Sequence, residues 1–112
     1  MRFSPKDPIE IVTLSFDFTK DLEIKNASGT VIGMKTITPA SQVTTVTAFK
    51  GIDADPSALK NGAPQISGNF VLQSAKLGID ENDYLIRTEI DASSGEHFVI
   101  GWVLPIRRRD NV

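Results

Sequence analysis

Short runs of alternating apolar and polar residues recur along the chain and predict β-strands. From Glu10 to Phe18 the apolar side chains share one parity, apart from Ile11, and polar residues hold the other. Residues 42–49 form the most β-branched segment of the chain, a composition that strands favour. We therefore expect a strand over each segment.

Turn-forming residues separate further runs of the same kind. We expect additional strands over residues 22–25, 30–38, 66–77, 85–90 and 97–106. The last two are joined by a Gly-containing turn and predict a β-hairpin. Gly33 indicates a bulge or an edge position in its strand, and Ser67-Gly68-Asn69 indicates an irregularity.

The longest irregular stretch, residues 50–65, contains one predicted helical turn. Asp55 is placed as its N-cap, Pro56 as its first residue and Gly62 as its end.

About seven short strands with frequent turns predict an all-β fold, namely an immunoglobulin-like antiparallel β-sandwich with one short helical turn in a long loop. A small closed barrel is the alternative. Tyr84 opens the penultimate strand after Leu77 and a polar turn, where such sandwiches bond a phenol back to the backbone. The expected core comprises Leu14, Phe16, Val46, Phe70, Leu72, Leu77, Tyr84, Ile86, Ile90, Phe98, Ile100 and Trp102.

With 112 residues the chain has room for one core. We expect an extended arm over residues 1–8, a single sandwich domain over 9–106 and a basic tail over 107–112. Two prolines keep the arm out of a helix. Lys6 and Asp7, which lie between them, are expected to be solvated, and we expect no core position in the arm.

Composition narrows the classes of partner. The net charge is −2, so the chain has no overall positive charge to attract nucleic acid. There is no cysteine, which excludes disulfides and metal sites with thiolate ligands. No run approaches the roughly 20 apolar residues of a membrane helix. Residues 1–8 lack the apolar core of a signal peptide. We expect neither nucleic acid nor a membrane as partner.

Few residues suggest chemistry. His97 is the only histidine and no nucleophile motif accompanies it, so we expect an exposed strand residue and not a catalytic base. Asp53 and Asp55 are the candidates for a metal site, but the further ligands of a calcium loop are missing. We interpret both as solvated turn acids and expect no catalytic residue, metal or cofactor.

The three arginines after Pro105 can meet carboxylates or phosphates of a partner. They fall short of the roughly five basic residues typical of a nucleic-acid tract. We expect a partner-contact surface made by flexible chain ends together with the 50–65 loop. Its predicted residues are Lys6, Asp7, Arg107, Arg108 and Arg109.

The start of the chain carries a more specific signal. It contains Phe3-Ser4-Pro5-Lys6-Asp7-Pro8-Ile9-Glu10, then Phe16-Asp17-Phe18-Thr19 and Leu22. This start resembles a family of small tailed-bacteriophage proteins, in which Pro-Lys-Asp-Pro-x-Glu precedes a strand with an Asp-aromatic-Ser/Thr unit. Most members have Trp where Phe18 stands, and the 50–65 insertion and Arg107–Arg109 have no counterpart. The resemblance implies an immunoglobulin-like domain of the fibre–tail adaptor type, without catalytic residues.

We therefore expect a non-catalytic structural or adaptor protein of a phage or prophage virion that links tail and fibre components. Its expected partners are other virion or tail proteins and further copies of itself. Its expected location is the virion, or the bacterial cytoplasm when it is expressed from a prophage. The alternatives are a carbohydrate- or peptide-binding sandwich that uses the 50–65 loop and, last, an enzyme with a metal at Asp53 and Asp55.

Overall fold

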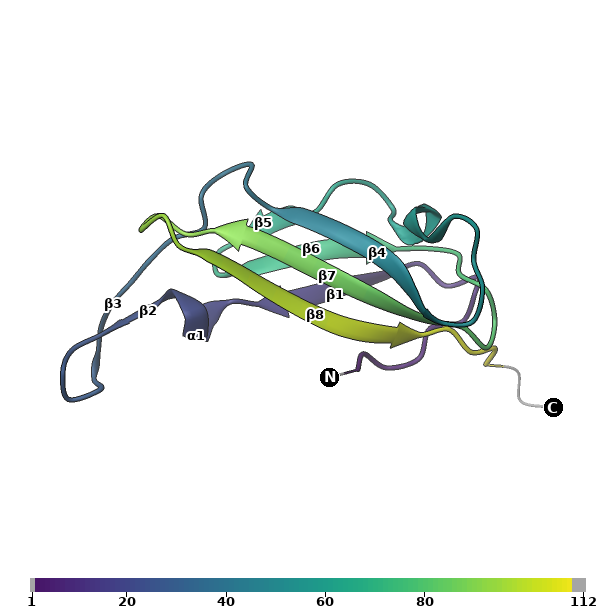
Figure 1. The fold of residues 1–112 in the computed structure, drawn as a ribbon, viewed down its shortest axis with the longest axis horizontal. Helices are drawn as coiled ribbons and strands as arrows, with labels where there is room; N and C mark the ends of the chain where they lie inside the picture. The colour runs from purple at the N-terminus through teal and green to yellow at the C-terminus, as the bar shows by residue number, and fades with distance from the viewer. Residues whose placement is uncertain (1, 110–112) are drawn as a thin grey trace.

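The computed structural model describes residues 2–109. In chain order the elements are β1 (Val12–Asp17), α1 (Thr19–Leu22), β2 (Glu23–Lys25), β3 (Val31–Met34), β4 (Val43–Lys50), the 3-10 helix η1 (Pro56–Leu59), β5 (Gln65–Ser67), β6 (Phe70–Ala75), β7 (Asp83–Asp91) and β8 (His97–Pro105) (Figure 1). Residue 1 of the predicted arm and residues 110–112 of the predicted tail lie outside the described residues.

Two three-stranded antiparallel sheets lie face to face (Figure 1). One sheet has the strand order β1-β6-β5 and the other β4-β7-β8. A single cluster of buried side chains from both sheets fills the space between them, including Phe16 of β1, Val71 of β6 and Ile86 of β7. The predicted all-β sandwich is confirmed.

A third, two-stranded sheet extends beyond the sandwich. We call it the β2–β3 ribbon (residues 23–34), because these strands pair only with each other in the described chain. The ribbon projects from one end of the molecule, along its long axis (Figure 1). The molecule measures 55 × 26 × 21 Å and has a radius of gyration of 16.0 Å, whereas a compact domain of this length has about 13 Å. The projecting ribbon explains the elongated shape.

The predicted strand over residues 66–77 is wrong as a single element. It is a hairpin, because Gly68 takes a left-handed turn (φ +60°) between β5 and β6. The expected core parity in β6 is wrong as well, since Phe70 is exposed and Val71 is buried. Val71 pairs with Phe16 of β1, and directly paired residues share a sheet face. Register with β1, which local sequence does not reveal, therefore decides which side chains enter the core.

Several other boundaries differ from expectation. Leu77 is exposed in the loop after β6 and does not join the core. The turn after β1 is the helical turn α1. The second helical turn begins after Asp55 as predicted, but it ends at Leu59, before Gly62, and Asp55 makes no side-chain capping bond. Gly33 does lie in an edge strand, beside a register shift.

Candidate partner-contact surface

The N-terminal arm lies along the end of β8 and is joined to the chain there by isolated parallel bridges, Arg2 with Val103 and Lys6 with Ile106. Phe3 N donates a hydrogen bond to Val103 O at 2.9 Å, and Lys6 N donates to Pro105 O at 3.0 Å. The Phe3 ring packs edge-on against Phe16, with 5.5 Å between centroids. The expectation that no core position lies in the arm is therefore wrong.

Lys6 is buried, with 1% of its surface exposed, so the expectation of a solvated Lys6 is also wrong. Its Nζ donates to Leu77 O at 2.7 Å and to Asp7 O at 2.9 Å. Burial lowers the pKa of Lys6, while the charges of Glu10 and Asp7 oppose this shift. Because its ammonium is committed to carbonyls of the same chain, Lys6 is not available to a partner in this conformation.

Asp7 joins the arm to the tail. Its carboxylate accepts hydrogen bonds from Ile9 N at 3.0 Å and from Arg109 N at 2.9 Å. These bonds hold the pKa of Asp7 below its ordinary value. Glu10 completes the turn, because its Oε1 accepts from Asp7 N at 2.7 Å. The ionisable residues of the Pro-Lys-Asp-Pro-x-Glu start thus fix the local chain path.

The tail is fixed by Arg107. Its guanidinium donates to the buried Asp83 at 2.8 Å, and its backbone N donates to Lys6 O at 2.9 Å. Burial disfavours ionisation of Asp83, but the bonds from Arg107 and Arg2 outweigh burial and lower its pKa. The described part of the tail is therefore held by hydrogen bonds to β7 and to the arm.

Two of the predicted partner-contact residues in the tail have side chains that are exposed to solvent. Arg108 and Arg109 are exposed, and Arg109 lies 3.6 Å from a carboxylate oxygen of Glu10. A contact role for these two arginines stays a prediction.

The 50–65 loop is fastened to the sandwich by Tyr84, which is fully buried. The Tyr84 hydroxyl donates to Asp53 Oδ2 at 2.6 Å and accepts from Ile79 N at 3.0 Å. The predicted bond from this phenol back to the backbone is confirmed. Burial, and next the bond to Asp53, raise the pKa of Tyr84.

The carboxylates of the two candidate metal ligands accept hydrogen bonds from the protein itself. Asp53 Oδ1 accepts from Asp55 N at 2.8 Å, and Asp55 Oδ1 accepts from Ser57 Oγ at 2.6 Å. Within residues 2–109 no group of three or more His, Asp or Glu side chains is placed to hold a metal ion.

His97 is exposed, as expected, but it has two acidic partners. Its Nδ1 lies 2.7 Å from Asp91 Oδ1, and its Nε2 lies 3.0 Å from Glu89 Oε1. Both bonds raise the pKa of His97. Asp91 is its direct cross-strand neighbour, so the hairpin register was the signal that could have identified this partner.

The chain ends, the start of the 50–65 loop and the 77–82 loop meet at one end of the molecule. Lys6 Nζ bonds Leu77 O, Asn82 Nδ2 bonds Ile52 O at 3.1 Å, and Asp7 bonds Arg109. We call the exposed side chains there the terminal surface. It comprises Ile9, Ile52, Leu77, Arg108 and Arg109. Ile9 and Ile52 are each 90% exposed, and no local sequence pattern predicts this exposure.

No family model, curated protein or solved structure matches this chain. Within the described part of the chain, no helix is long and apolar enough to cross a membrane.

Proposed function

We propose that this chain is a non-catalytic structural or adaptor protein of a phage or prophage virion, where it links tail and fibre components. The observation that carries the proposal is the terminal surface. There Ile9 and Ile52 are almost fully solvent-exposed, Arg108 and Arg109 are exposed, and the backbone N–H groups of Ile9 and Arg109 bond the same Asp7 carboxylate. Apolar side chains with arginine are the composition enriched in protein–protein contacts.

The rigid attachment of this end supports the proposal. Lys6, Asp7 and Arg107 bind the arm, the tail and the 77–82 loop to one another through the bonds described above. A surface that is already ordered loses little conformational freedom on binding, which favours affinity.

The resemblance to fibre–tail adaptors supports the class of partner. Three of the residues that carry the resemblance are Lys6, Asp7 and Glu10. Their hydrogen bonds hold the arm, the tail and the 77–82 loop together beneath the terminal surface.

Purified virions test the proposal. Particles from a producing strain are separated on a density gradient, washed with salt and analysed by quantitative mass spectrometry, with a non-structural phage protein as the negative control. We expect this chain to band with tail proteins at a constant ratio. Its absence from particles, when the lysate contains it, contradicts the proposal.

The second candidate is the ligand-binding sandwich, and one observation favours it. A groove of about 360 Å³ lies on the outer face of β4 and β7, within the range of about 300–1,000 Å³ for small-molecule sites. It is lined by Thr45, Thr47, Leu85, Arg87 and Glu89. Retention of the protein on an array of acidic glycans, and loss of that retention in Arg87→Ala, would support this function. An array without binding would exclude it for these ligands.

A further inference from the structure

One edge of the β4-β7-β8 sheet is open. The carbonyl of Val103 accepts from Phe3 N and therefore points away from β7. Backbone groups alternate in direction along an antiparallel strand, so Val99 and Gly101 also direct their N–H and C=O groups away from β7. Within residues 2–109 no backbone group pairs with them, because the arm meets β8 only from Val103 onward. We call residues 97–101 the open edge.

Part of the opposite edge of this sheet is covered. Lys60 Nζ donates to Thr44 O of β4 at 3.0 Å, and Gln42 Nε2, just before β4, donates to Pro64 O at 3.2 Å. The 50–65 loop therefore covers the start of β4. Proteins commonly cover, charge or interrupt strand edges that would recruit other strands. The open edge contains neither lysine nor proline.

The β2–β3 ribbon has unpaired edges of its own and exposes apolar side chains. Ile24, Val31, Ile32 and Met34 are all exposed, Ile32 by 64%. Lys25 is the only charged residue between Ile24 and Met34, although 23% of the chain is charged. A lone two-stranded ribbon is marginally stable in water, and depletion of charge is typical of interface centres.

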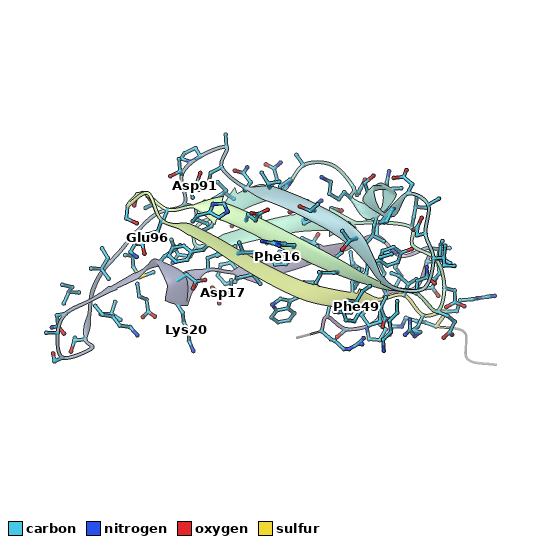
Figure 2. All side chains as sticks on the ribbon, in the orientation of Figure 1. Phe16, Asp17, Lys20, Phe49, Asp91 and Glu96 are labelled. Atoms are coloured by element: carbon cyan, nitrogen blue, oxygen red, sulfur yellow. The ribbon has the colours of Figure 1, made fainter. Side chains whose placement is uncertain are left out.

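The ribbon and the open edge lie at the same end of the molecule. Ser93 N in the β7–β8 turn donates to Thr36 O, just after β3, at 2.8 Å. Figure 2 shows Asp91 and Glu96 at this turn. Glu96 pairs there with Lys35, just after β3, and Asp91 pairs with His97, so the turn and the base of the ribbon are joined within one chain.

We propose that a second copy of this chain binds here, with the ribbon of each copy lying along the open edge of the other. Strand addition pairs the outward backbone groups of Val99 and Gly101, and the ribbon's apolar side chains cover Val99. Since each copy offers both surfaces from the same end, the contact is isologous and closes as a two-fold dimer. This self-association does not depend on a role in a virion.

Sedimentation equilibrium of the full chain over a range of concentrations tests the dimer. We expect Ile32→Asp to raise the dissociation constant by about tenfold or more, because a charge replaces an apolar side chain in a desolvated contact. Ile11→Asp is the matched control, since Ile11 is 66% exposed outside the ribbon and the open edge, and we expect it to leave the constant unchanged. A monomer at all concentrations, a ring or filament, or equal effects of the two variants overturns the proposal.

A second measurement locates the contact without disturbing it. The chain has no cysteine, so Ile32→Cys and Val99→Cys chains can be mixed and joined by a short bis-maleimide. We expect a mixed cross-linked pair, and much less product when Ile11→Cys replaces Val99→Cys. Equal yields in the two mixtures overturn the assignment of the open edge even if a dimer forms.

Discussion

At the scale of single residues, the least predictable feature is Lys6. A lysine between two prolines near a chain end is ordinarily solvated, and nothing in its local sequence signals burial. Its burial depends on Leu77 O, which lies far along the chain. Tyr84 is the opposite case, because its place after a polar turn and at the start of a strand predicted a bond between its phenol and the backbone, and the partner is Ile79 N.

Tyr84→Phe tests the phenol that fastens two loops. The substitution keeps the buried ring but leaves Ile79 N and Asp53 without their partner. We expect a loss of about 1–3 kcal/mol in the free energy of unfolding, measured by urea denaturation. A double-mutant cycle with Asp53→Ala should show coupling between the two side chains. A change within experimental error would mean that the hydroxyl stabilises neither loop.

His97→Gln tests the acidic pair on the β7–β8 hairpin. Because Glu89 and Asp91 raise the pKa of His97 in the folded state, the histidine stabilises the fold fully below its unfolded pKa of about 6.5. This stabilisation is lost as pH rises through the folded pKa. We expect the melting temperatures of the two proteins to differ most at acid pH and to converge at alkaline pH. A difference independent of pH would contradict the pairing.

At the scale of elements, strand patterns predicted the β7–β8 hairpin and β4 but not β6. The β7 and β8 runs are flanked by a clear turn, so their register follows from sequence. In β6 both parities contain apolar residues, and the choice of Val71 over Phe70 for the core depends on pairing with β1. The arm was misjudged for a related reason, since a parallel partner in β8 leaves no local signature.

Deletion of residues 1–8 tests whether the arm belongs to the fold. It removes Phe3 from its packing against Phe16 and Trp102 and removes the backbone bonds to β8. We expect a lower urea midpoint, and Phe3→Ala alone should cost less than the roughly 1.5–3 kcal/mol of a fully buried side chain, because Phe3 is only half-buried. Ser4→Ala, at an exposed position of the same arm, is the control. An unchanged midpoint after deletion of 1–8 would show that the arm contributes nothing to stability.

At the scale of the whole molecule, the chain presents two surfaces at opposite ends of its 55 Å length (Figure 1). The β2–β3 ribbon and the open edge lie at one end, and the terminal surface lies at the other. Self-association at the first end would leave the second free for a different partner. The sequence suggested the chain ends and the 50–65 loop, which do meet at the second end, but it did not reveal the burial of Lys6 or the exposure of Ile9, because both depend on contacts with distant parts of the chain.

The most direct measurement is the occupancy of variant protein in purified virions. Ile9→Asp combined with Ile52→Asp alters the terminal surface, whereas Val43→Asp, at an exposed position on β4, is the control. Circular dichroism first establishes that both proteins are folded, and mass spectrometry then gives the number of copies per particle relative to a tail protein. We expect the double variant to be depleted from particles and the control to be incorporated like the natural chain. Normal incorporation of the double variant would contradict a role for the terminal surface in virion attachment.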